Sequence, residues 1–229
     1  MKEMLARHKG KLILSSLVIL LPILPAAFAG QTLFLWEPVL LLVSQWVIML
    51  VVLHANRNKE QSPKVLNLVA WILPVLSLLL GVVGQLAQGG ADSAYLITAL
   101  FTFFMGLLFF LIGNYMPKTK QNGAVGIRIK WTLESEENWD ATHRYAGKLW
   151  CLGGLLLMVC ALIPSVLAVI LLWIVILAAM VILPTRYSYR FYKSQVAEGK
   201  VERRPGKPRN IVLIAVLILG VGAFPAWAL

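Results

Sequence analysis

The sequence predicts an all-α protein: a polytopic transmembrane helical bundle of about seven spans. The first reason is composition, because 59% of the 229 residues are hydrophobic and only 14% are charged. A soluble domain is closer to half apolar and a quarter charged. The second reason is that the apolar residues gather in runs of about twenty. An α-helix needs about that length to cross a ~30 Å hydrocarbon core, so the expected solvent of this chain is the lipid bilayer.

The first expected span follows a basic N-terminal flank, and its end resembles a signal-peptide cleavage site. We interpret this segment as a first transmembrane helix, with a kink expected at Pro22 or Pro25. The remaining spans follow from apolar runs separated by polar or turn-forming segments. The seven expected spans are Leu12–Ala29, Leu35–Leu53, Val65–Leu86, Tyr95–Ile112, Ala146–Ile163, Val166–Leu183 and Ile211–Leu229.

Basic residues alternate along this series of spans. All 21 Lys and Arg residues lie before span one, between spans two and three, between four and five or at the start of five, and between six and seven. The segments around Gln31 and Asp92 and the Pro164-Ser165 turn contain none. Because basic loops stay on the cytoplasmic side, we expect a cytoplasmic N-terminus and an external C-terminus after the seventh span. Topology therefore accounts for the net charge of +11, and we expect no direct contact with nucleic acid.

The segment between spans four and five, Gly113–Tyr145, is not explained by the membrane. Its first half is rich in Asn, Pro and Gly, which favour irregular backbone. Its second half has the features of a helix start, where Thr132 or Ser135 can cap free N–H groups. A helix from about Ser135 would place Glu136, Trp139 and His143 on one face and continue into span five. Trp139 and Trp150 would then bracket the membrane boundary, where indole rings are enriched.

This segment resembles the signature of the SdpI family of bacterial membrane proteins. The resemblance rests on Gly113-Asn114, Pro117-Lys118, Asn122, Gly126-Ile127-Arg128, Trp131-Thr132-Leu133, Glu136, Trp139 and Thr142-His143-Arg144, with Tyr187-Ser188-Tyr189 similar to the end of the family's domain. The chain departs from the family pattern at Met116, Gln121 and Ile129. It also lacks the histidine expected after the first helix, and its seventh span is extra.

The resemblance implies three regions and a location in the bacterial cytoplasmic membrane. Residues 1–94 would form an N-terminal region of three spans, residues 95–193 an SdpI-like domain with its signature loop at 113–145, and residues 194–229 a basic connector with an extra span. The functional candidates that it implies are Asn114, Pro117, Lys118, Asn122, Gly126, Arg128, Trp131, Thr132, Glu136, Trp139, Thr142, His143 and Arg144.

The implied function is self-immunity. Such a protein protects a cell from a secreted antibacterial peptide and can hold a cytoplasmic transcriptional repressor at the membrane while the peptide is present. On this hypothesis the peptide is sensed or neutralised in the spans, and the signature loop organises the response. The partners would be the bilayer, the peptide and the repressor.

Two other functions remain as alternatives. An intramembrane hydrolase could use Glu136 and His143 as a carboxylate–histidine pair. However, the sequence has no HExxH, G-x-S-x-G or phosphate-loop motif, so we favour a non-enzymatic protein with no metal or cofactor. A small-molecule or peptide transporter would be expected to carry ionisable residues inside its spans. Those spans contain almost none, and Glu37 lies near the outer edge of span two.

Overall fold

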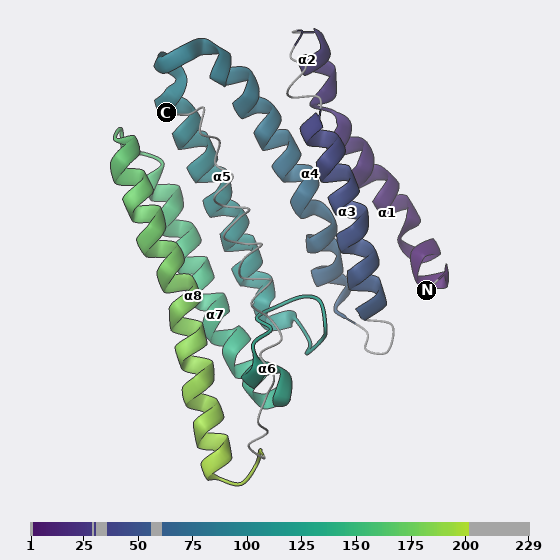
Figure 1. The fold of residues 1–229 in the computed structure, drawn as a ribbon, viewed down its shortest axis with the longest axis vertical. Helices are drawn as coiled ribbons and strands as arrows, with labels where there is room; N and C mark the ends of the chain where they lie inside the picture. The colour runs from purple at the N-terminus through teal and green to yellow at the C-terminus, as the bar shows by residue number, and fades with distance from the viewer. Residues whose placement is uncertain (1, 29, 31–35, 56–60, 202–229) are drawn as a thin grey trace.

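The computed structural model describes residues 2–28, 30, 36–55 and 61–201 of the chain. Every regular element among these residues is helical, which confirms the predicted all-α fold (Figure 1). The expected seventh span and most of the basic connector lie outside the described residues. The elements are α1 (Lys2–Leu20), α2 (Ile23–Phe28), α3 (Trp36–Ala55), α4 (Pro63–Leu86), η2 (Ala87–Ser93), α5 (Ala94–Tyr115), η3 (Met116–Lys118), α6 (Lys130–Glu134), α7 (Glu136–Cys160) and α8 (Val166–Ala197).

Five helical segments within the described part of the chain are long and apolar enough to cross a membrane. They correspond to predicted spans one to four and six. Helix α7, the predicted fifth span, is not among these five, because its first half, up to Lys148, is polar. It nevertheless runs alongside α5 and α8 in Figure 1. The protein is therefore a multi-pass membrane protein.

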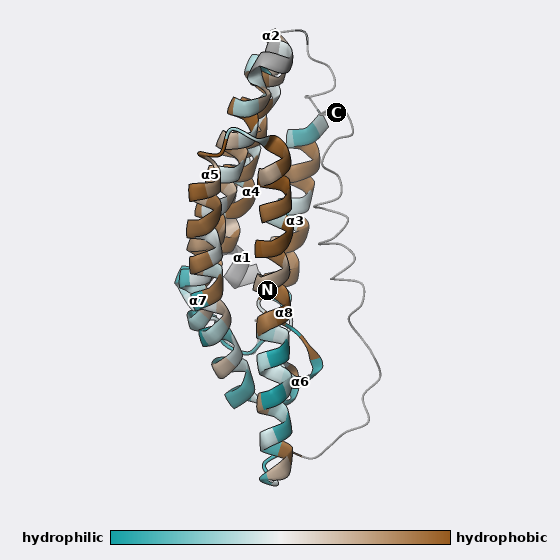
Figure 2. Cartoon of the chain, turned by 90° about the vertical axis from the view of Figure 1, so that its left-hand side faces the viewer, coloured by the Kyte–Doolittle hydropathy of each residue, from teal (hydrophilic) through white to brown (hydrophobic). Residues whose placement is uncertain are grey.

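The helices form two groups of three. Helices α1, α3 and α4 pack together as an N-terminal bundle, and α5, α7 and α8 pack together as a C-terminal bundle (Figure 1). The turn of 3-10 helix η2 joins the two groups at one end, where Gly90 has a φ of 68°. Polar residues gather at the opposite end, which includes α6 and the end of α8 (Figure 2). We call this the basic end, because the Lys- and Arg-containing segments of the described chain lie there.

A break between α1 and α2 confirms the kink that was predicted from the prolines of span one. Regular helix stops at Leu20 and resumes at Ile23, with Pro22 in the intervening turn. The Ser77 hydroxyl of α4 donates a 2.8 Å hydrogen bond to the Ile19 carbonyl just before the break. Pro22 also packs onto Gly81, where an added Cβ would lie 2.6 Å from the Pro22 Cβ. The broken helix is thus seated directly on α4.

Both bundles contain a proline inside a long helix, and each compensates for it in the same way. Pro74 has no N–H, so the carbonyl four residues earlier, that of Ala70, loses its helical donor. The Gln45 side chain of α3 supplies a replacement through a 2.8 Å hydrogen bond. Such replacement matters in lipid, because no water is present to satisfy a freed carbonyl.

In the C-terminal bundle the proline is Pro184 of α8. The carbonyl that loses its helical donor belongs to Met180. The Trp150 indole N–H of α7 lies 3.2 Å from this carbonyl and donates to it. Trp150 is thereby fixed between helices, next to Phe109.

Helices α5 and α7 approach each other closely along a line of glycines. Gly106 of α5 faces Gly154 of α7, and Gly113 faces Gly147. Within each helix the two glycines are seven residues apart, which is close to two helical turns. An added Cβ on Gly154 would lie 2.5 Å from the Gly106 carbonyl oxygen, and one on Gly113 would lie 2.6 Å from the Cys151 nitrogen. Only glycine permits this spacing of the two backbones.

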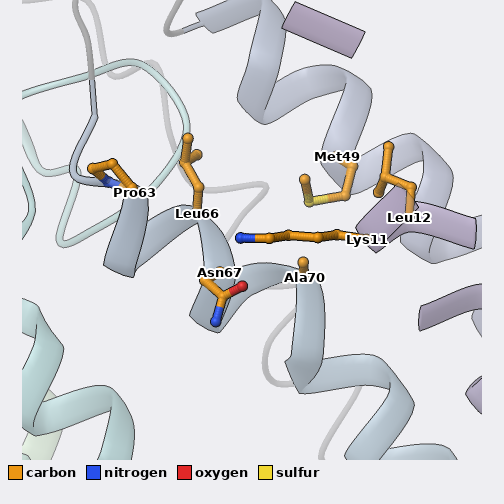
Figure 3. A pocket seen from close by; sticks show the side chains of 7 residues that line it. All are labelled: Lys11, Leu12, Met49, Pro63, Leu66, Asn67 and Ala70. Carbon is orange, nitrogen blue, oxygen red and sulfur yellow. The ribbon is translucent and has the colours of Figure 1, made fainter. Parts of the chain in front are cut away.

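A small cavity lies between α1, α3 and α4 in the half of the N-terminal bundle nearer the basic end. Its volume of about 30 Å³ suffices for roughly one water molecule. Figure 3 shows the Lys11 side chain extended past Ala70 towards Leu66 and Asn67 of α4. The cavity is lined by Lys11, Leu12, Met49, Pro63, Leu66, Asn67 and Ala70.

Candidate functional site at the basic end

Residues 113–145, which we call the signature block, fold into a compact unit at the basic end of the C-terminal bundle. The block consists of the end of α5, η3, an irregular loop, the short helix α6 and the first turns of α7. The last turns of α8 pack against α6 and α7. The predicted helix start is confirmed, since the Ser135 hydroxyl accepts a 3.1 Å hydrogen bond from the Asn138 N–H and α7 begins at Glu136.

Asn122 organises the irregular loop. Its side-chain oxygen accepts hydrogen bonds of 2.7 Å from the backbone N–H groups of Ala124 and Val125. Its amide nitrogen donates to the carbonyls of Lys120, at 2.7 Å, and Val125, at 2.9 Å. One buried side chain thereby satisfies four backbone groups, which explains how a loop without regular structure holds one conformation.

Gly126 brings the loop backbone onto His143. Its φ of 117° lies in a region that other residues rarely adopt, and an added Cβ would lie 2.5 Å from the His143 Nε2. The close approach lets the Ile127 N–H donate a 2.9 Å hydrogen bond to that nitrogen. The other ring nitrogen, Nδ1, lies 2.8 Å from the Trp139 carbonyl and donates to it. His143 is therefore a neutral imidazole with both nitrogens engaged.

Burial strengthens this preference for the neutral ring. His143 is 0% exposed, and desolvation lowers its pKa to about 4, although the hydrogen bond to the Trp139 carbonyl acts in the opposite direction. Near neutral pH it has neither a free lone pair nor a free proton. His143 therefore acts as a structural residue of the block.

Trp139 lies inside the block, so its indole does not face the headgroup region as the prediction of a boundary residue supposed. Its side chain is 0% exposed, and its ring stacks on His143 with centroids 4.1 Å apart. Its indole N–H donates a 2.7 Å hydrogen bond to the Thr119 carbonyl. The loop folds back over this face of α7 and supplies the polar partner that a headgroup region would otherwise offer.

A second buried network joins the block to α8. The Asn138 side-chain nitrogen donates to the carbonyls of Trp131 and Ser188, at 3.2 and 3.1 Å. Its oxygen accepts from the hydroxyls of Thr142, at 2.9 Å, and Ser188, at 3.0 Å. Asn138 and Ser188 were not among the candidates. The signal that could have identified Asn138 is its position one turn before Thr142 on the helix.

Thr132 and Gln121 close the lower part of the block. The Thr132 hydroxyl lies 2.7 Å from the Ile127 carbonyl, to which it donates, and it accepts from the Ile129 N–H at 3.2 Å. The Gln121 side chain donates to the carbonyls of Thr132 and Leu133, at 2.8 and 3.1 Å. These bonds hold the strand-like segment before α6 against the loop.

The sequence-predicted candidates therefore separate into three sets. Buried partners or close backbone contacts bring together Asn122, Gly126, Thr132, Trp139, Thr142 and His143. Arg128 and Trp131 are half-buried; desolvation lowers the pKa of Arg128, and the Trp131 ring contacts Tyr189 at 4.9 Å. The outward-facing candidates are Asn114, Pro117, Lys118, Glu136 and Arg144.

Glu136, Trp139 and His143 lie along one face of α7, as their spacing predicted, but Glu136 is not buried with the other two. Glu136 is exposed in the first turn of α7, whereas the buried face is formed by residues such as Asn138, Trp139, Thr142 and His143. Both ring nitrogens of His143 are instead engaged by backbone groups, those of Ile127 and Trp139. A carboxylate–histidine pair for hydrolysis is not assembled here. Among the described residues, no group of His, Cys, Asp and Glu is suited to holding a metal ion.

Comparisons with known proteins find a family match that includes most of the signature block. Residues 118–188 match the SdpI/YfhL protein family. The chain is also 28% identical over 179 residues to the "Immunity protein SdpI" of Bacillus subtilis (strain 168), a match that covers 74% of this chain and 79% of the relative. No solved structure gives a significant match. With its apolar helices, the protein is a multi-pass integral protein of a bacterial membrane. The part that matches the family runs from Lys118, at the end of η3, to Ser188 of α8.

Proposed function

We propose that this protein is an SdpI-type immunity protein that protects a bacterial cell from a secreted antibacterial peptide. The observation that carries the proposal is the similarity to a protein named as an immunity protein, which extends well beyond residues 118–188. The peptide would be sensed or neutralised among the membrane spans. The signature block would present the cytoplasmic surface that responds, and retention of a repressor protein there is the finer part of the proposal.

The block supports a binding function better than a catalytic one. Its buried polar groups are used in folding the loop, as His143 and Asn138 illustrate. The groups left for a partner are the outward-facing candidates, among them Lys118, Glu136 and Arg144. Arg144 donates to the backbone carbonyl of Asp140 at 3.3 Å, which leaves most of its five N–H donors for a partner.

The test is survival of a sensitive bacterium, with and without this protein, against a panel of secreted antibacterial peptides. We expect selective survival against one peptide. Absence of protection against every peptide, with the protein confirmed in the membrane, would contradict the proposal. Mass spectrometry of the peptide against which the protein protects would show that peptide intact if the protein binds it and shortened if the protein cleaves it.

The surface residues are tested next with Arg144→Ala. We expect at least a roughly tenfold loss of protection, the equivalent of about 1.4 kcal/mol of binding free energy, with unchanged protein in the membrane. Arg190→Ala is the matched control, because Arg190 is an exposed arginine of α8 outside the candidate set. Equal protection by both variants would remove Arg144 from the proposed surface.

A further inference from the structure

Gln61 connects the N-terminal bundle to the signature block. Its side-chain nitrogen donates a 2.7 Å hydrogen bond to the Lys120 carbonyl, and its side-chain oxygen accepts a 3.2 Å bond from the Lys120 N–H. The two residues are 59 positions apart, and Gln61 is only 6% exposed. Both polar ends of one amide are thus used to hold one backbone unit of the other half of the molecule.

Each side of this contact is firmly attached to its own bundle. Gln61 is followed by Ser62 and Pro63, where α4 begins, and the Ser62 carbonyl accepts from the Val65 and Leu66 N–H groups at 3.0 and 3.1 Å. A movement of α4 at this end therefore moves Gln61 directly.

On the other side, Lys120 lies between residues that anchor the loop. The preceding carbonyl, that of Thr119, accepts from Trp139, and the Lys120 carbonyl also accepts from Asn122. Asn122 and Trp139 in turn hold the loop that reaches His143 through Ile127. A displacement of Lys120 consequently reaches the core of the block within two contacts.

We infer that Gln61 is a positioning residue through which the N-terminal bundle sets the conformation of the loop at residues 119–127. In the immunity function, and resting on that proposed function, Gln61 would pass a rearrangement of α1, α3 and α4 caused by the peptide to the cytoplasmic surface. The coupling itself depends only on the contacts and can be measured without any peptide.

The chemistry of residue 61 predicts a graded series. Gln61→Glu keeps an acceptor for the Lys120 N–H but loses the donor to its carbonyl, whereas Gln61→Leu loses both. We expect hydrogen exchange of the amides in residues 119–127 to rise by roughly tenfold in Gln61→Leu and by less in Gln61→Glu. The measurement is hydrogen–deuterium exchange with mass spectrometry on the full chain in lipid nanodiscs.

The matched control is Gln195→Leu. Gln195 is also a buried glutamine, 3% exposed, but its bond to the Glu137 carboxylate, at 2.9 Å, joins α8 to α7 within the C-terminal bundle. It should leave exchange in residues 119–127 unchanged. An equal rise in both glutamine variants would mean general loosening of the block and would overturn the inference.

A double-mutant comparison separates coupling from local support. Gln45→Leu disturbs the N-terminal bundle at the Ala70 carbonyl. We expect it to raise exchange in residues 119–127 when Gln61 is present and to add nothing when residue 61 is leucine. Additive effects, or no effect of Gln45→Leu on the loop, would overturn the inference. Ser77→Ala, which removes the bond to Ile19, is the milder disturbance if Gln45→Leu does not fold.

The killing assay distinguishes failure of this inference from failure of the proposed function. If the wild-type protein protects and Gln61→Leu, present in the membrane, also protects fully, coupling through Gln61 has no part in immunity. If the wild-type protein protects against no peptide, the immunity proposal fails, whereas the exchange data still decide whether Gln61 couples the bundles. Loss of protection in Gln61→Leu but not in Gln195→Leu supports the inference.

Discussion

The two bundles use the same device for a proline in a membrane helix but differ in how tightly their helices meet. In the N-terminal bundle Gln45 caps the carbonyl freed by Pro74, and in the C-terminal bundle Trp150 caps the one freed by Pro184. The Trp150 indole has one N–H donor and no acceptor, so this bond leaves no polar atom of its side chain without a partner. The Gln45 oxygen remains buried without a hydrogen-bond partner in the described part of the chain.

The same contrast holds for the helix interfaces. Glycines allow α5 and α7 to approach until their backbones almost touch, and the signature block then seals their basic end. The N-terminal bundle instead has a small cavity near that end, beside Lys11 and Ala70. Close packing along the glycine line and the hydrogen-bonded loop fit the C-terminal bundle to hold a fixed surface. On the proposed function, the N-terminal bundle, which contains this cavity, is the half that would adjust to a ligand within the membrane.

The largest expected effect comes from closing the glycine line. In Gly154→Ala the new Cβ would lie 2.5 Å from the Gly106 oxygen and the Phe110 nitrogen, both backbone atoms that cannot rotate away. We expect a loss of more than about 3 kcal/mol in unfolding free energy, above the usual cost of overpacking. Thermal unfolding followed by size-exclusion chromatography in detergent measures it.

Gly10→Ala is the control for that substitution. No heavy atom lies within 4 Å of its added Cβ, so the change should be neutral or stabilise α1 by up to about 1 kcal/mol. The two variants make the same chemical change and differ only in the space available. Similar unfolding temperatures for both would contradict the glycine-dependent packing of α5 on α7.

The next effect is the pH dependence of the C-terminal bundle. The pKa of His143 is lowered to about 4 in the folded state, from an ordinary value of 6.5, because burial disfavours the charged ring. The unfolded state therefore binds more protons between these values. Stability is fully present above about pH 6.5 and falls by up to about 3 kcal/mol as pH decreases to about 4. Below that pH, His143 causes no further loss.

Unfolding temperatures from pH 8 to pH 4 should reveal this slope in the wild-type protein. In His143→Gln, the part of the slope that His143 contributes should disappear, although the variant is less stable at every pH. Parallel curves for the two proteins would show that His143 is not held neutral by the block. The two proteins contain the same carboxylates. The acid titration of these groups therefore contributes equally to both curves and cancels when one curve is subtracted from the other.

Local patterns were sufficient to predict the helices and one end of the block. The apolar runs identified the spans, the prolines of span one predicted its break, and Ser135 marked the start of α7. These features depend on residues close together in the sequence. The charge alternation likewise placed the Lys- and Arg-containing segments of the described chain at one end.

Contacts between distant residues could not be predicted in this way. Trp139 was expected at the membrane boundary because tryptophan is common there. Only the tertiary fold shows that the loop covers its ring. The role of Gln61 depends on a backbone unit 59 residues away, and the role of Gln45 depends on a carbonyl freed by Pro74 of another helix. The role of a polar residue in a span can thus be recognised only when a proline in a neighbouring helix is known to leave a carbonyl without its helical donor.

The smallest expected effect tests that last point in the N-terminal bundle. Gln45→Leu removes the donor to the Ala70 carbonyl and should reduce the unfolding free energy by about 1–3 kcal/mol, the cost of a buried group left without a partner. It also removes the unpartnered Gln45 oxygen, which offsets part of the loss and places the effect at the lower end.

Restoring the missing backbone donor should rescue this variant. In Gln45→Leu with Pro74→Ala, the residue 74 N–H can bond the Ala70 carbonyl again, so we expect stability equal to or above that of the wild-type protein. Pro74→Ala alone should gain less, because Gln45 already supplies that bond. Thermal unfolding of all four proteins gives the coupling between residues 45 and 74. Purely additive changes would mean that Gln45 does not compensate for the proline, and the parallel between the two bundles would then fail at this carbonyl.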